Sequence, residues 1–146
     1  MIGRADAPVR LLQVTDPHLF ADESQTLYGV QTAVSLRKVL EEAFAAGTPR
    51  PDAILATGDI ADDHTAAAYA NFRRQVEPYG LPLFCLPGNH DEPSLMTHLV
   101  NERGFQYGGT AELGAWGAVF IDTHVPGRPE GRRRVVQADQ DRAIAQ

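Results

Sequence analysis

Short apolar runs alternate with longer amphipathic stretches along most of the chain. Residues 9–15, 53–57 and 82–86 are apolar runs of strand length, each followed within two residues by proline or glycine. Such runs predict three buried β-strands. A fourth strand is expected at residues 118–121.

The stretches between these runs have the spacing of helices. Residues 30–46 carry apolar side chains three and four positions apart, which places them on one face of a helix. Thr65 is suited to cap a second helix that reaches Glu77, and a short third helix follows Pro93 and ends near Gly104. Strands that alternate with helices predict an α/β fold, with a mainly parallel sheet flanked by helices.

Composition adds limits to this picture. The 146 residues are 43 % apolar and 22 % charged, which fits a single domain with its own core over residues 1–146. A net charge of −6 argues against a general nucleic-acid surface, and the basic run Arg132–Arg134 is typical of a solvated face. Cys85 is the one cysteine and lies in an apolar run, so we expect a buried thiol without an internal disulfide.

No part of the sequence indicates a membrane partner. Residues 1–8 lack the apolar stretch of a signal peptide, and no segment approaches the length of a membrane span. We therefore expect a soluble, cytoplasmic protein.

Polar clusters follow each of the first three predicted strands. They are Asp16-Pro17-His18, Gly58-Asp59-Ile60-Ala61-Asp62 and Gly88-Asn89-His90-Asp91. Functional groups of open α/β sheets gather beyond the carboxyl ends of the strands, so the three clusters should meet in one crevice. The first two clusters taken alone could also be a turn or a helix start, but the order of the third has no structural reason.

The residue types in the clusters point to divalent metals. Carboxylates, imidazoles and an Asn carbonyl are ligands for Mn, Fe, Co and Zn. The two oxygens of Asp59 allow it to bridge two ions, and two neighbouring ions form a clamp for displacement at phosphorus. The pattern therefore favours metal-dependent phosphoryl chemistry.

These motifs resemble those of the calcineurin-like metallophosphoesterase family, which run D-x-H, G-D-x-x-D and G-N-H-[DE]. The stretch from Val9 to Gly131 is similar to the bacterial 3′,5′-cyclic AMP phosphodiesterases of that family. The resemblance implies the N-terminal half of a four-layer αββα sandwich. It divides the domain into a family-like part, residues 8–131, and a divergent tail, residues 132–146.

The resemblance also implies roles for the clustered residues. Asp16 and His18 would bind a first metal, Asp59 would bridge both ions, and Asn89 would bind the second. The implied cofactors are two divalent ions, Fe or Mn before Zn or Co. The implied reaction is hydrolysis of a phosphodiester by metal-bound hydroxide, with 3′,5′-cyclic AMP or a related cyclic nucleotide as substrate.

Three further roles follow from the same resemblance. His90 would stand near the leaving oxygen, as proton donor or charge stabiliser. Asp91 would orient His90 through a hydrogen bond, and Asp62 would cap the turn that follows it.

The chain departs from the family in its histidines. Family members carry a further His ligand and a Gly-His-x-His motif later in the sequence, whereas the histidines here are His18, His64, His90, His98 and His124. His64 and His98 are expected at the surface, and His124 in a variable loop.

These missing histidines suggest a C-terminally incomplete domain with one sheet face left exposed. Two alternatives to an active enzyme follow. The first is a truncated, catalytically inactive metal-binding remnant, and the second is one part of a homo-oligomer or of a complex with a complementing chain.

Overall fold

The computed structural model describes residues 2, 3, 6–100 and 104–123, without the side chains of His98 and Val100. Its elements, in chain order, are β1 (Leu11–Val14), α1 (Thr32–Ala43), β2 (Ala53–Ala56), α2 (Ala66–Val76), the short 3-10 helix η1 (Glu77–Tyr79), β3 (Leu83–Cys85), α3 (Pro93–Val100), β4 (Phe105–Tyr107), β5 (Gly109–Leu113) and β6 (Trp116–Phe120). The predicted tail, residues 132–146, and His124 lie outside the described residues.

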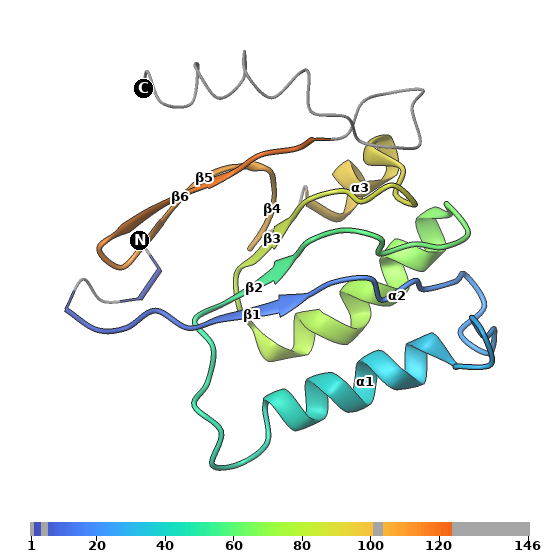
Figure 1. The fold of residues 1–146 in the computed structure, drawn as a ribbon, viewed down its shortest axis with the longest axis horizontal. Helices are drawn as coiled ribbons and strands as arrows, with labels where there is room; N and C mark the ends of the chain where they lie inside the picture. Colours follow the sequence, from blue (N-terminus) through green and yellow to red (C-terminus); the bar gives the residue numbers. More distant parts are fainter. Residues whose placement is uncertain (1, 4–5, 101–103, 124–146) are drawn as a thin grey trace.

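The centre of the fold is a parallel sheet with strand order β1-β2-β3-β4. The register pairs Val14 with Ala56 and Ala56 with Cys85, so the carboxyl ends of the first three strands lie level with one another. All strands therefore deliver their following loops to the same edge (Figure 1). The predicted α/β fold with a mainly parallel sheet is confirmed.

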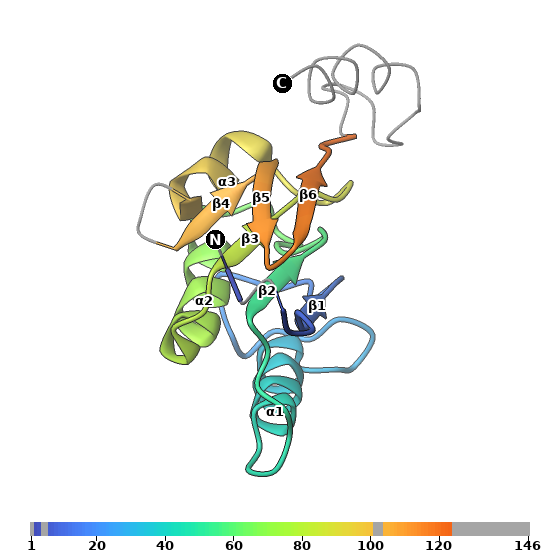
Figure 2. The same cartoon turned by 90° about the vertical axis from the view of Figure 1, so that its left-hand side faces the viewer.

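The helices cover one face of this sheet. Alternate strand residues, among them Val14, Ile54 and Cys85, point into a core that the apolar faces of α1, α2 and α3 complete. Figures 1 and 2 show α1 and α2 side by side along that face. Cys85 is fully buried there, as its apolar surroundings predicted.

The opposite face packs against the antiparallel pair β5–β6 (Figure 2). Ala53 and Phe84 are buried under Leu113, and the rings of Phe84 and Phe120 stack with centroids 4.5 Å apart. The expectation of an exposed sheet face is therefore wrong for β2 and β3. It holds at β1, where Leu11 is 45 % exposed.

The strand predictions fail in one respect. The predicted fourth strand exists as β6, but it belongs to the antiparallel pair, and the fourth strand of the parallel sheet is β4. Phe105–Tyr107 has only three residues, all half-buried, and so lacks the apolar run that identifies a buried strand.

The helix predictions agree with the structure to within a few residues. The Thr65 hydroxyl accepts a hydrogen bond from the Ala68 backbone N–H, so it caps α2 as expected. No helix in the described part of the chain has both the length and the apolar character that crossing a membrane requires.

Candidate metal centre

The loops that follow β1 and β2 run side by side at the carboxyl edge of the sheet. The backbone N–H groups of Asp16, His18 and Leu19 donate to carbonyls of the β2–α2 loop over 3.0, 2.9 and 2.8 Å. This ladder extends the β1–β2 pairing past the sheet and fixes the first polar cluster against the second.

Three of the clustered residues have a left-handed backbone. Asp16, His18 and Asp59 have φ values of 54°, 44° and 51°. This conformation is uncommon for side chains with a Cβ, and persists only where the surroundings enforce it. The loop ladder supplies that constraint, and the turns aim all three side chains at one point.

Two glycines allow the β3–α3 loop to lie close against the β2–α2 loop. A Cβ on Gly58 would lie 2.5 Å from the Gly88 nitrogen, and a Cβ on Gly88 would lie 2.0 Å from Asp59 Oδ1. The His90 backbone N–H donates to that same Oδ1 over 3.0 Å. Asp59 is thus buried against the loop that carries the Gly-Asn-His-Asp cluster.

The structure brings together the three residues predicted to bind the first metal, and their ligand role stays a prediction. His18 Nε2 lies 3.9 Å from Asp16 Oδ1 and 3.8 Å from Asp59 Oδ2. One ligand atom from each of the three residues falls within 4.8 Å of the other two. One imidazole nitrogen and two carboxylate oxygens at this spacing suit an ion held at about 2.0–2.2 Å from each.

Asp62 has a different role from the predicted one. Its Oδ1 lies 3.0 Å from His18 Nδ1, which leaves His18 Nε2 turned to Asp16 and Asp59. The following turn is instead capped by Asp63, which accepts from the Thr65 hydroxyl over 2.7 Å and from the Ala21 N–H over 2.6 Å. The prediction for Asp62 is therefore wrong, because Asp62 faces the site and its neighbour Asp63 faces the turn.

His90 lies beside His18 at the mouth of the cluster. The two imidazole rings meet edge to face with centroids 5.0 Å apart, and His90 Nδ1 is 3.6 Å from Asp62 Oδ1. Asn89 is exposed and directly precedes His90 on the same loop. The ligand role of Asn89 and the catalytic role of His90 stay predictions.

Asp91 does not hydrogen-bond the His90 side chain, so that prediction is wrong. In the described structure its carboxylate accepts hydrogen bonds from the backbone N–H groups of Ile60, Ala61 and Gly88 and from the Tyr69 hydroxyl. Asp91 is only 5 % exposed, below the loops, where every lone pair needs a donor. It ties the β2–α2 loop to the β3–α3 loop.

The groups around Asp91 hold their protons strongly. Burial raises the pKa of the Tyr69 hydroxyl, and the charge of Asp91 raises it further. Burial likewise raises the pKa of Cys85 to about 12, with a smaller contribution from Asp91. Tyr69 therefore remains a hydrogen-bond donor to this carboxylate at any ordinary pH.

Sequence reasoning missed the position of His64. It is exposed, as predicted, but its ring lies parallel to that of His90, at 3° and with centroids 6.3 Å apart. A histidine directly before the capping residue of a helix carries no pattern that signals this proximity.

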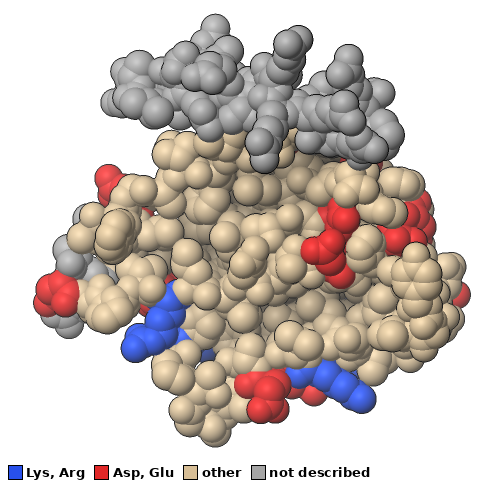
Figure 3. All heavy atoms as spheres, viewed as in Figure 1, with Lys and Arg blue, Asp and Glu red and all other residues tan. Residues whose placement is uncertain are grey.

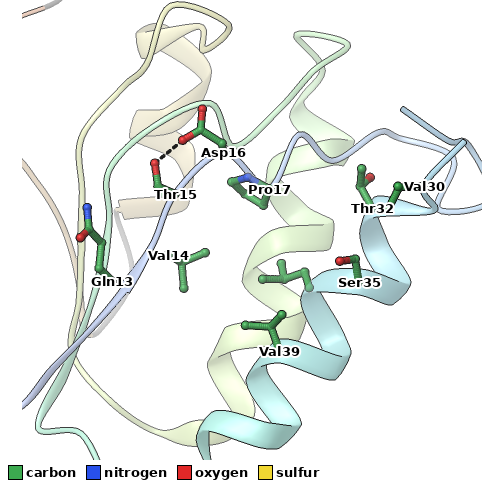
Figure 4. Close-up of a pocket in the computed structure, with 10 residues that line it drawn as sticks. Gln13, Val14, Thr15, Asp16, Pro17, Val30, Thr32, Ser35 and Val39 are labelled. Carbon is green, nitrogen blue, oxygen red and sulfur yellow. Dashed lines mark hydrogen bonds between the residues drawn. The ribbon is translucent and has the colours of Figure 1, made fainter. Parts of the chain in front are cut away.

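A hollow lies next to the cluster, between β1 and α1. Its cavity volume is about 360 Å³, and Val14, Leu36 and Val39 form its apolar wall while Asp16 stands at its end (Figure 4). Acidic side chains lie on the side of the molecule where the strands end, and others lie on the opposite side (Figure 3). The carboxylates of Asp16 and Asp59 suit a site that binds cations.

Comparisons with known proteins agree with this geometry. The family described as Calcineurin-like phosphoesterase matches residues 9–136. The chain is 39 % identical over 140 residues to the 3′,5′-cyclic adenosine monophosphate phosphodiesterase CpdA of Haemophilus influenzae, covering 94 % of this chain and 51 % of that protein. The CpdA proteins of Pseudomonas aeruginosa and Escherichia coli K12 are 40 % and 38 % identical, each over 86 % of this chain and 46 % of their own length.

The chain thus spans about half the length of the curated relatives it matches. The parallel sheet with its helices agrees with the N-terminal half of the fold that the resemblance implied. Phosphoesterases of this type depend on metal ions, and the chain offers a fitting ligand group. The chain belongs to the calcineurin-like phosphoesterase family.

Proposed function

We propose that this chain carries the metal-binding part of a phosphodiesterase that hydrolyses 3′,5′-cyclic AMP or a related cyclic nucleotide. The observation that carries the proposal is the cluster of Asp16, His18 and Asp59 on the two converging loops that follow β1 and β2. The names of the relatives, which are cyclic AMP phosphodiesterases, support the substrate class.

The proposed cofactors are two divalent ions, Fe or Mn in preference to Zn or Co. Asp16, His18 and Asp59 would hold the first ion, and Asp59 with Asn89 would contribute to the second. A pair of such ions polarises phosphoryl oxygens and lowers the pKa of bound water toward neutrality. The buried position of Asp59 between the second and third loops supports a bridging role.

His90 is the proposed group at the leaving oxygen. Its imidazole is 43 % exposed, so a bound ester can reach it, and it stands edge to face against the metal ligand His18. Asp62 lies within 3.6 Å of its Nδ1 and would stabilise the protonated ring that donates to the leaving oxygen.

Hydrolysis of cyclic AMP by the Mn²⁺-loaded chain tests the proposal. We expect Asp59→Asn to lower the rate by more than about 100-fold, because it removes a metal ligand rather than an outer partner. Asp52→Asn is the matched control, since Asp52 binds the Arg10 N–H at the opposite end of the sheet. Equal rates in all three proteins would contradict the site, and metal binding without turnover would favour the inactive remnant.

A further inference from the structure

His64 stands at the entrance of the metal centre without belonging to it. Its exposed ring lies parallel to that of His90, which in turn contacts the ring of His18. His64 therefore extends the line of imidazoles outward from the proposed metal ligand to solvent.

The backbone holds His64 in an uncommon conformation at this place. Its φ is 54°, in the left-handed region. Asp63 fixes the turn, because one carboxylate oxygen binds Thr65 and the other binds the Ala21 N–H of the β1–α1 loop. A strained residue held from both sides presents its side chain in a defined direction.

The His64 ring does not pack closely on the His90 ring. The contacting pairs Phe44–Tyr79 and Phe84–Phe120 have centroids 3.9 and 4.5 Å apart, whereas His64 and His90 are 6.3 Å apart. The exposed His64 ring therefore offers a face on which a planar ligand can stack.

We propose that His64 is a specificity-determining residue that stacks on the base of a nucleotide whose phosphodiester lies at the metal centre. The inference rests on the proposed function and adds the recognition of the base to it. His90 keeps its proposed place at the leaving oxygen, and the phosphate is left to the metal ligands. Stacking requires a planar ring at position 64 but no hydrogen-bond donor, so it differs from a contact to phosphate.

The experiment measures binding of two probes to the Mn²⁺-loaded chain by ³¹P NMR line broadening. One probe, adenosine 3′,5′-cyclic monophosphorothioate, carries a base, and the other, dimethyl phosphate, has none. His64→Gly removes the ring and suits the left-handed backbone, His64→Asn keeps a donor without the ring, and His64→Phe keeps a ring without a donor.

We expect the Gly and Asn variants to bind the nucleotide about 5- to 20-fold more weakly and dimethyl phosphate unchanged, while Phe restores nucleotide binding. Mn²⁺ affinity should be the same in all variants. Equal losses for both probes, or unchanged nucleotide binding in His64→Gly, would overturn the inference alone. Failure of the parent chain to bind either probe while it binds Mn²⁺ would overturn the proposed function and the inference together.

Discussion

His18 is constrained at both of its ring nitrogens. Nε2 faces the carboxylates of Asp16 and Asp59, and Nδ1 lies 3.0 Å from Asp62 Oδ1. Metal-binding histidines usually donate their second ring N–H to such a carboxylate, which fixes the tautomer and strengthens the ligand. Residue type and spacing in the sequence pointed to the candidate ligands, but the direction of the Asp62 side chain depends on a contact between residues 44 positions apart.

Asp62→Asn tests this arrangement at the residue scale. An amide keeps the shape but loses the charge that orients His18, so we expect Mn²⁺ affinity to fall by about 10- to 100-fold. Isothermal titration of Mn²⁺ gives the affinity, and Asp52→Asn serves as the control for loss of one carboxylate. Unchanged affinity in Asp62→Asn would show that His18 needs no such partner.

Gly88→Ala tests the close approach of the two loops. The added Cβ would lie 2.0 Å from Asp59 Oδ1, so the loops must separate and tight Mn²⁺ binding should be lost. We expect a destabilisation of about 1–3 kcal/mol, as for other overpacked positions. Gly117→Ala is the matched control, because a Cβ there meets no atom of the described residues within 4 Å. Thermal unfolding measures the destabilisation of each variant, and a Mn²⁺ titration measures its metal affinity.

At the scale of elements, three strand–loop units converge and α2 holds two of them together. Tyr69 of α2 donates to Asp91 Oδ1 and accepts from the Glu92 N–H over 2.8 Å. Sequence patterns predicted the three strands and the helices between them, because each has a clear period. They missed β4 and β5, which are short and partly exposed. The family resemblance implied the wrong partner for Asp91, because this buried carboxylate accepts hydrogen bonds from the backbone that the fold brings near it.

Tyr69→Phe measures what this link contributes. The variant deprives a buried carboxylate and a backbone N–H of a partner, which costs about 1–3 kcal/mol. Urea unfolding should show that loss, whereas Tyr28→Phe, at a side chain that is 98 % exposed, should stay within about 0.5 kcal/mol of the parent chain. Similar values for the two variants would mean that the Tyr69 hydroxyl does not support the loops.

At the scale of the whole molecule, the helix layer, the parallel sheet and the β5–β6 pair bury two separate apolar clusters. The larger one contains Cys85, whose pKa burial raises from its ordinary 9.0 to about 12. Between these values only the unfolded chain loses the thiol proton. The stability that the buried Cys85 thiol contributes is therefore fully present below about pH 9 and is lost as the pH rises toward 12.

We expect the free energy of unfolding to decrease from pH 8.5 to pH 10 by up to about 1.4 kcal/mol per unit. Urea unfolding at several pH values gives this slope, and Cys85→Ala should flatten it even though the smaller side chain lowers stability at every pH. The raised pKa of Tyr69 adds a loss of the same sign above pH 10. An identical slope in Cys85→Ala would exclude the thiol as the cause.

The central claim is that the loops after β1 and β2 form a divalent-metal site around Asp59, and Mn²⁺ binding followed by electron paramagnetic resonance tests it most directly. The account predicts that the chain binds at least one Mn²⁺, that Asp59→Asn weakens this binding by more than about 100-fold, and that Asp52→Asn leaves it unchanged. Binding of equal strength in the parent chain and both variants would contradict it.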